Sequence, residues 1–361
     1  MLKIVLAVFI LLHAMIHLMG FAKAFQFAEL KQLTLPISKS MGLIWLITTL
    51  VFLMAIVLLF LNKAQWTLLA ASAIILSQFL IILNWKDAKF GTIANVLILI
   101  SIIMAWGSTH FENKYKKDVK TSMSLIDKSL NPVITEEDIK VLPEPVQRYL
   151  KYVGVINKPR VINMRVKLRG EMRDKGKEFF EFESEQYNFL NEQTRLFFMK
   201  AKMFGVTVPG YHKYIETKAS MDIRFFGLFK IVYHDGEVMD KAETVTFFND
   251  MCILAPATLI DKRIKWEQID NNTVKAQFTN HSITISAMLY FNEKGQLINF
   301  ISKDRSAVSD MKQYPFSTPI SSYKQIRGYN IFENAETVWQ YPDGLFTYGK
   351  FHLVDIEYNV E

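Results

Sequence analysis

The sequence predicts a two-part protein, an α-helical membrane domain with four transmembrane helices followed by a β-rich α+β domain whose curved antiparallel sheet wraps around an internal helix. Four long apolar runs fill residues 1–108. After Pro159 the apolar residues recur with a period of two, which is typical of half-buried strands. Between about 240 and 261 they recur at three- and four-residue intervals, which is typical of a helix. We therefore assign 1–108 to the membrane domain, 109–134 to a juxtamembrane linker and 135–361 to the β-rich domain.

The apolar runs have the length of membrane-spanning helices. A bilayer core about 30 Å thick needs roughly 20 helical residues, which the first three runs reach and the fourth nearly reaches. Tryptophans fall at or near the ends of the runs, as in the aromatic belts of membrane proteins. We therefore expect four transmembrane helices. The runs are Leu2–Phe21, Gly42–Leu61, Trp66–Leu83 and about Gly91–Gly107, and the tryptophans are Trp45, Trp66, Trp85 and Trp106.

The net charge of +7 is concentrated beside these runs. Residues 1–108 hold seven lysines, no arginine and two acidic residues, whereas 109–361 is nearly balanced. Lysines in such positions anchor helices to lipid headgroups, so the partner that the charge indicates is membrane lipid. A nucleic-acid partner has no support beyond the basic isoelectric point. The lone Cys252 excludes an intrachain disulfide.

The lysines give a limited prediction of membrane orientation. Four spans place both ends of the chain on one side, and lysine numbers on the two sides are six and five, which leaves the positive-inside rule undecided. The first helix has more lysines after it than before it, which favours an outside amino terminus. We therefore expect 109–361 on the extracytoplasmic face.

His13 and His17 lie four residues apart on one face of the first run. One interpretation is a polar site in the membrane, such as a metal or haem ligand pair or a proton-linked site. The other is that the imidazoles hydrogen-bond to polar residues of the neighbouring helices and hold the bundle together. Candidate partners for the second interpretation are Gln78, Asn84, Asn95 and Ser101.

The β-rich domain opens with two short helices. Thr135 is a capping residue before three acidic residues, and Pro145 suits position N1 of a second helix that ends at Gly154. The alternating runs and the turn residues between them predict a series of strands. The strands are Ile162–Arg169, Lys177–Leu190, Arg195–Met203, Tyr211–Phe226, Phe229–Tyr233, Ile264–Ile269, Thr273–Asn280, Ser282–Phe291, Gln296–Ser302, Tyr323–Phe332, Thr337–Tyr341 and Leu345–Tyr358, with a turn expected at Pro209–Gly210.

The helix predicted at about 240–261 has the features of a plug inside the curved sheet. Asp240 and Glu243 have the spacing of a capping box, which predicts the start of the helix. Pro256 ends this helix or starts a second short one. The apolar stripe consists of Phe247, Phe248, Met251, Cys252, Ala255 and Leu259.

Catalytic motifs are missing from the sequence. There is no GxSxG, HExxH, Walker or post-strand GxGxxG pattern. The histidines and aspartates of the second domain have no spacing that favours a hydrolytic site, and isolated surface histidines on strands account for them. The sequence therefore favours a non-enzymatic protein, with no metal and no cofactor. The residues considered are His212, His234, His281, His352, Asp222, Asp235, Asp250 and Asp261.

Three stretches carry a resemblance to a known family. LPEPVQRYLKYVG, FFNDMCILAPATLID followed by IKW, and VWQYPDGLFTYGKFHLVDIEYN resemble an uncharacterised bacterial family, a domain of unknown function found behind N-terminal membrane helices. The resemblance covers about 135–361 and implies a location in the bacterial cytoplasmic membrane. In architecture alone, the sheet with its internal helix is similar to the lipoprotein-carrier (LolA-like) proteins, whose curved sheets hold acyl chains. That likeness implies a ligand only by analogy.

Two functions are compatible with these features. In the first, the β-rich domain binds a lipid, an acyl group or another apolar ligand at the membrane surface, in a mostly apolar cavity between sheet and plug. Asn249 and Asp250 either line that cavity or bond to the ends of neighbouring elements, and Trp266 fits a core residue better than a ligand platform. The residues predicted to line the cavity are Phe247, Phe248, Met251, Ala255, Leu259, Asn249, Asp250 and Trp266.

The alternative is a solid-cored module that senses a signal or binds a protein partner. In that case the membrane helices carry the activity. The two functions differ in whether the inward side chains leave room for a ligand, which the sequence does not show.

Overall fold

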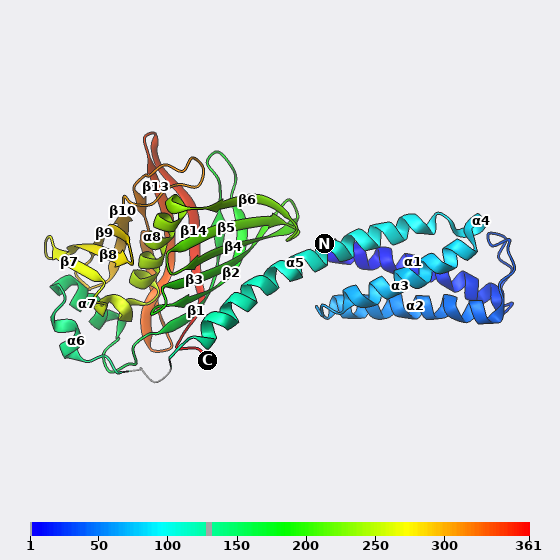
Figure 1. Ribbon diagram of the computed structural model, residues 1–361, viewed down its shortest axis with the longest axis horizontal. Helices are drawn as coiled ribbons and strands as arrows, with labels where there is room; N and C mark the ends of the chain where they lie inside the picture. Colours follow the sequence, from blue (N-terminus) through cyan, green and yellow to red (C-terminus); the bar gives the residue numbers. More distant parts are fainter. Residues whose placement is uncertain (1, 128–131) are drawn as a thin grey trace. The chain divides into compact units, whose positions relative to one another are not determined.

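Long apolar helices form the first part of the structure, a computed structural model that describes residues 2–127 and 132–361 (Figure 1). Within these residues, four helices are long and apolar enough to cross a membrane. They are α1 (Leu2–Ala24), α2 (Lys39–Phe60), α3 (Trp66–Leu83) and α5 (Gly91–Ser124), with the short α4 (Trp85–Ala88) before the last. The chain divides into two units, one holding residues up to Phe111 with Phe226–Leu228, and the other Glu112–Phe225 and Phe229–Glu361.

Small side chains form the centre of the helical unit. Ala14 of α1, Ala55 of α2 and Ala70 of α3 are fully buried in one cluster with Phe52. Small residues let helix backbones approach closely, as they do in membrane bundles. The outward faces carry exposed leucine, isoleucine and valine, so these helices are apolar on both the inner and the outer side.

α5 continues well past its apolar part. The predicted linker 109–134 is helical as far as Ser124, and 128–131 of it lie outside the described residues. The helix continues because the sequence from 109 to 124 holds several lysines, which are good helix formers, and neither glycine nor proline. Glu112 and Lys116 also form an i,i+4 ion pair of 2.8 Å.

The two short helices that open the second unit are α6 (Glu136–Lys140) and α7 (Glu144–Val153). Thr135 caps α6 in a capping box, in which the Asp138 carboxylate accepts the Thr135 backbone N–H at 2.8 Å. Gly154 ends α7 with a φ of +81°, a conformation that glycine adopts without strain. Both sequence predictions are confirmed.

The strands of the described chain form one curled antiparallel sheet, a half-barrel. Its order is β6-β5-β4-β3-β2-β1-β14-β13-β11-β10-β9-β8-β7, with β12 pairing β13 beside this path. The predicted fold class is therefore confirmed. The strands are β1 (Asn163–Met172), β2 (Phe180–Phe189), β3 (Thr194–Met203), β4 (Val206–Ile215), β5 (Lys218–Phe225), β6 (Phe229–Asp235), β7 (Ile264–Gln268), β8 (Thr273–Asn280), β9 (Ile283–Phe291), β10 (Leu297–Ser302), β11 (Phe316–Ser317), β12 (Ile320–Ile326), β13 (Tyr329–Tyr341) and β14 (Gly344–Tyr358).

Three predicted strands are wrong in their extent, and one of them, Thr337–Tyr341, is the end of β13. The stretch Tyr211–Phe226 is not one strand, because the chain turns after β4 at Glu216, which has a φ of +57°. The turn expected at Pro209–Gly210 lies inside β4, where Pro209 is opposite Lys200 of β3. The stretch Tyr323–Phe332 also contains a turn, between β12 and β13.

The plug is a helix, as predicted, in two pieces: α8 (Glu237–Ile253) and a 3₁₀ helix η1 (Pro256–Ile260). Figure 1 shows α8 within the curl of the sheet, between β7–β10 and β2–β6. Nearly every side chain of α8 from Met239 onward is buried. A helix buried all round needs partners for each of its polar groups.

The predicted capping box at Asp240 and Glu243 is wrong. The helix starts one turn earlier, after Gly236, whose φ of +88° suits glycine. The Asp240 carboxylate instead accepts the backbone N–H of Ala219 at 2.7 Å and an Nζ–H of Lys218 at 2.9 Å. Asp240 therefore ties α8 to the start of β5.

Replacing Asp240 by alanine is expected to cost about 1–2 kcal/mol of stability, because the Ala219 N–H loses its acceptor. Asp240→Asn keeps an acceptor oxygen and is the matched control, with a smaller loss expected. Cys252 is fully buried and is the only cysteine, so its modification by a thiol reagent in the full chain reports opening of this unit. Equal labelling rates for the alanine and asparagine variants would contradict this role.

Candidate functional site

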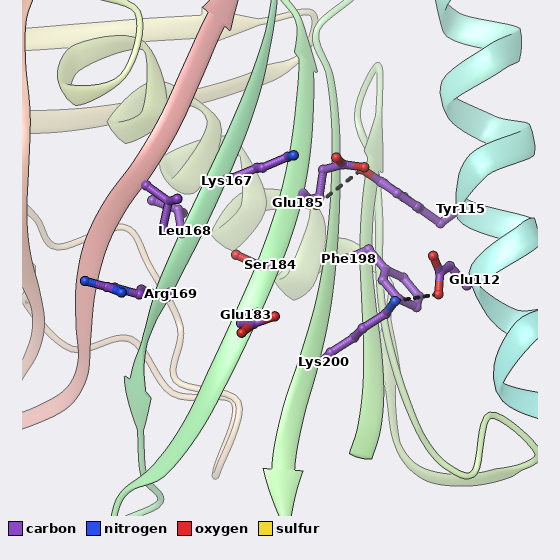
Figure 2. Close-up of a pocket in the computed structure, with 11 residues that line it drawn as sticks. Glu112, Tyr115, Lys167, Leu168, Arg169, Glu183, Ser184, Glu185, Phe198 and Lys200 are labelled. Carbon is purple, nitrogen blue, oxygen red and sulfur yellow. Dashed lines mark hydrogen bonds and ion pairs between the residues drawn. The ribbon is translucent and has the colours of Figure 1, made fainter. Parts of the chain in front are cut away.

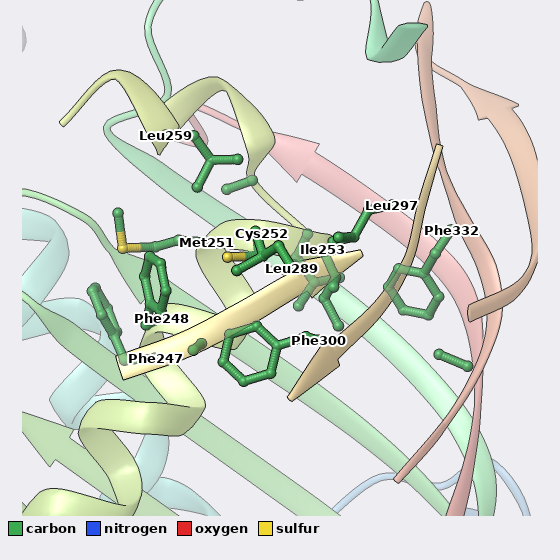
Figure 3. Packing of buried hydrophobic residues seen from close by; sticks show 14 of the residues in the cluster. Phe247, Phe248, Met251, Cys252, Ile253, Leu259, Leu289, Leu297, Phe300 and Phe332 are labelled. Carbon is green, nitrogen blue, oxygen red and sulfur yellow. The ribbon is translucent and has the colours of Figure 1, made fainter. Parts of the chain in front are cut away.

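The apolar residues predicted to line a cavity come from α8 and from η1 with its N-cap, and they meet in the interior of the β-rich unit. Phe247 and Phe248 face Phe278 of β8, with ring centroids 6.3 and 5.1 Å apart. Met251, Ala255 and Leu259 are also fully buried, and Figure 3 shows the phenylalanines beside Leu289 and Phe300. These side chains pack against other apolar side chains of the hydrophobic core. A cavity-lining role for them stays a prediction.

The three remaining predicted residues have different surroundings. Trp266 on β7 is half-buried against the core, and its buried indole N–H donates to none of the described residues. Asn249 donates from Nδ2 to the Thr318 hydroxyl at 2.9 Å. Its buried Oδ1 accepts no hydrogen bond within the described chain. Asp250 belongs to a buried ionic group on the other side of α8.

Arg195 of β3 is the centre of this ionic group. It faces α8 because inward positions alternate along β3, and its side chain is only 9% exposed. Its Nε donates to the Asp250 carboxylate at 2.7 Å, and its Nη1 donates to the Glu243 carboxylate at 3.2 Å. One cation thus lies between two buried carboxylates that are about two turns apart on the same helix.

Two amide side chains of β2 complete the ionic group. The Gln186 Nε2–H donates to Asp250 at 2.7 Å, and the Asn188 Nδ2–H donates to the same oxygen at 3.1 Å. Gln186 also accepts from Arg195 Nη2 at 3.1 Å. Three donors therefore hold one Asp250 oxygen, so this buried carboxylate is well supplied with hydrogen bonds.

His212 of β4 lies at the edge of the ionic group. Its Nδ1 is 4.0 Å from a Glu243 oxygen, too far for a hydrogen bond, and its side chain is 20% exposed. Burial and then the charges of Arg195 and Arg305 lower the pKa of His212 to about 3. At neutral pH His212 is therefore uncharged.

The concave face of the sheet becomes less buried towards one end. Along β1, Met164, Val166 and Leu168 are buried, whereas Met172 at the end of the strand is half-buried. On β3 the same change occurs between Ala201 and Met203. The half-buried apolar side chains at this end form what we term the rim row: Met172, Phe180, Met203, Ile223, Val232, Phe346 and Tyr348.

A polar hollow of about 500 Å³ lies on the opposite face of the sheet, beside the second half of α5 (Figure 2). Among its charged lining residues, Glu112 pairs with Lys200 at 2.6 Å. The Tyr115 hydroxyl donates to the Glu185 carbonyl at 3.3 Å. These contacts fasten the second half of α5 to the sheet.

His13 and His17 form a hydrogen-bonded group in the helical unit. His13 Nε2 is 2.9 Å from Asn95 Oδ1, and His17 Nε2 is 2.9 Å from the Ser77 hydroxyl. Asn95 was among the expected partners and Ser77 was not. Within the described residues, no group of three potential metal-ligating side chains occurs. A functional role for the pair stays a prediction.

Comparison with known proteins adds a family to this geometry. A sequence model for a family of unknown function, DUF6544, matches residues 132–351, more than half of the chain. The chain belongs to DUF6544. The resemblance seen in the sequence to an uncharacterised family is thereby confirmed.

Other comparisons are less informative for this DUF6544 chain. None of the curated proteins matches it. A LolA superfamily protein from Nitrosomonas europaea is similar over 63% of this chain and 95% of its own, with 8% sequence identity and a TM-score of 0.35. The family assignment therefore rests on the sequence match.

Most of the polar residues of this site were not predicted from the sequence. Asp250 was predicted as a site residue, whereas Glu243, Arg195 and Arg305 were not. The sequence does carry one signal for Arg195. It lies at every second position of the strand with Phe197 and Met199, whose side chains point inward. An arginine among inward apolar residues indicates a buried carboxylate partner.

Proposed function

We propose that this protein is a binding module held at a membrane by its four apolar helices, and that the β-rich unit takes a lipid or another apolar ligand on the rim row. The supporting observation is the change in burial along the concave face. Large apolar side chains stay half-exposed at one end of several neighbouring strands, and such a surface is typical of a binding site.

Strand register supports a continuous surface. Met172 pairs directly with Phe180, and Ile223 pairs directly with Val232. Met203 lies on β3, between the two pairs in the order of the sheet. A chain-like ligand placed across these strands would bury apolar surface at about 25 cal/mol per Å².

The membrane location has its own support. The four long helices carry apolar side chains on their outward faces, which suits lipid as the surrounding medium. Placement of the β-rich unit on the extracytoplasmic face stays a prediction, based on the lysines around the first helix.

A solid-cored module that binds a protein partner is the second candidate. The observation that favours it is the complete burial of Phe247, Phe248 and Met251 on α8. In this case the rim row contacts a protein and not a lipid.

A photo-crosslinking residue separates these candidates. We expect p-benzoylphenylalanine at Met203, in the full chain in its membrane, to form adducts with acyl lipids on irradiation, detected by mass spectrometry of the peptide. The matched control is the same residue at Lys202, which is adjacent but on the other face and 63% exposed. Protein adducts without lipid adducts at Met203, or equal lipid adducts at both positions, would count against the proposal.

A further inference from the structure

Arg305 is a half-buried cation that no carboxylate of the described chain pairs with. It lies in the loop after β10, and its Nη1 donates to the Tyr348 hydroxyl at 2.8 Å. Its guanidinium lies over Phe316 at 4.0 Å from the ring centroid and within 5.3 Å of the Trp339 centroid. The aromatic rings hold the position of the charge but do not neutralise it.

Several other arginines of the unit have carboxylate partners. Arg195 contacts Asp250 and Glu243, and Arg263 contacts Asp261 at 2.5 Å. A guanidinium has five N–H donors, and within the described chain Arg305 uses one. None of the side chains around Arg195 fills a donor position of Arg305 within the described chain. Such a group is suited to an external anion.

Arg305 is adjacent to the rim row through Tyr348. The Arg173 backbone N–H donates to the Tyr348 carbonyl at 2.9 Å, and Met172 pairs with Gly349. Tyr348 therefore connects the Arg305 guanidinium to the apolar side chains at the ends of β1 and β2. An anion at Arg305 has apolar surface beside it.

We infer that Arg305 binds the anionic headgroup, a phosphate or a carboxylate, of an amphiphile whose acyl chain lies on the rim row. The inference rests on the proposed function and adds the ligand class to it. Planar, two-pronged donation to phosphate or carboxylate oxygens is what a guanidinium does better than an ammonium group.

The test is native mass spectrometry of the full chain in dodecyl maltoside, titrated with palmitoyl glycerol phosphate, palmitoyl glycerol or inorganic phosphate. We expect the phosphate amphiphile to bind about tenfold or more tightly than palmitoyl glycerol, as befits a charge-assisted hydrogen bond. Arg305→Gln should remove this preference, so that the two amphiphiles bind with about equal affinity. Arg305→Lys should keep part of it, and this variant also guards against loss of folding.

Arg327→Gln is the matched control, since it removes one positive charge from an arginine that pairs with Asp355 and Glu357. It should retain the preference. A preference that survives Arg305→Gln, or equal binding of both amphiphiles to the wild type, would overturn the headgroup inference and leave the proposed function intact. Binding of neither amphiphile would overturn both. Phosphate binding that depends on Arg305 without any amphiphile preference would indicate a soluble anion as ligand and overturn the inference.

Discussion

Replacing Arg195 by methionine is expected to lower the opening free energy of the β-rich unit by about 3–5 kcal/mol, the usual effect of removing one partner from a buried ion pair. The loss is large because the substitution leaves the carboxylates of Asp250 and Glu243 buried without a cation. Three donors to one Asp250 oxygen become two. Cys252 labelling in the full chain should accelerate by roughly two to four orders of magnitude.

A comparison with Arg327→Met separates burial from charge. Arg327 is 48% exposed and forms ion pairs of 2.7 Å with Glu357 and 3.1 Å with Asp355, so its loss should change stability by about 0–1 kcal/mol. Adding Glu243→Gln and Asp250→Asn to Arg195→Met should restore part of the loss, because the unpaired buried charge is then absent. Equal destabilisation by Arg195→Met and Arg327→Met would show that the ionic group contributes no more than a surface pair.

The general architecture was predictable because it depends on repeated patterns. Apolar runs of membrane length, alternation in strands and a helical period in the plug each extend over many residues, so single exceptions do not hide them. The cap at Thr135 and the left-handed glycine at Gly154 were also predictable, because neighbouring residues decide the structure at both positions. Such local signals need no knowledge of the tertiary fold.

Tight turns between strands were harder to predict. The β3–β4 turn uses Phe204 and Gly205 with φ of +52° and +75°, and the β12–β13 turn uses Arg327 and Gly328 with +49° and +78°. Two-residue hairpin turns with positive φ usually show asparagine or aspartate before glycine. Phenylalanine and arginine give no such signal. Pro209–Gly210 does give a turn signal, but in the structure both residues pair within the sheet.

Arg195 was missed for a physical reason. Along β3 both faces are buried, since Leu196 and Phe198 on the outer face are covered as completely as Phe197 and Met199 on the inner face. A strand buried on both faces has no alternation, and its sequence does not show which way an arginine points. Partners for Arg195 come from 48 and 55 residues further along the chain. Only the tertiary fold brings them together.

Acidification is expected to destabilise the β-rich unit through His212, by about 2 kcal/mol at pH 5 relative to neutral pH. The pKa of His212 is about 3 in the folded protein, against 6.5 for an unperturbed histidine. Below pH 6.5 the unfolded chain binds a proton that the folded chain does not, so stability falls as the pH falls towards 3. Above about pH 7 both states are neutral at this residue, and the contribution is constant.

The charges around His212 explain the direction of this pKa shift. Burial disfavours the imidazolium, and Arg195 and Arg305 repel it. Glu243 acts in the opposite direction, but its carboxylate is 4.0 Å from Nδ1 and is already paired with Arg195. The repulsion and the burial therefore outweigh the attraction.

His212→Gln should remove this part of the pH dependence. Opening is measured by Cys252 labelling of the full chain, with each rate divided by that of the urea-unfolded chain at the same pH, so that the titration of the thiol itself cancels. Between pH 7 and pH 5 the wild-type rate ratio should rise by roughly 30-fold more than that of the variant. At pH 8 the two should differ only by a pH-independent amount, which reports the lost packing of the imidazole on Phe197. A variant that keeps the full acid sensitivity of the wild type would contradict this prediction. Other groups would then govern the loss of stability in acid, and His212 would have the same pKa in the folded and the unfolded chain.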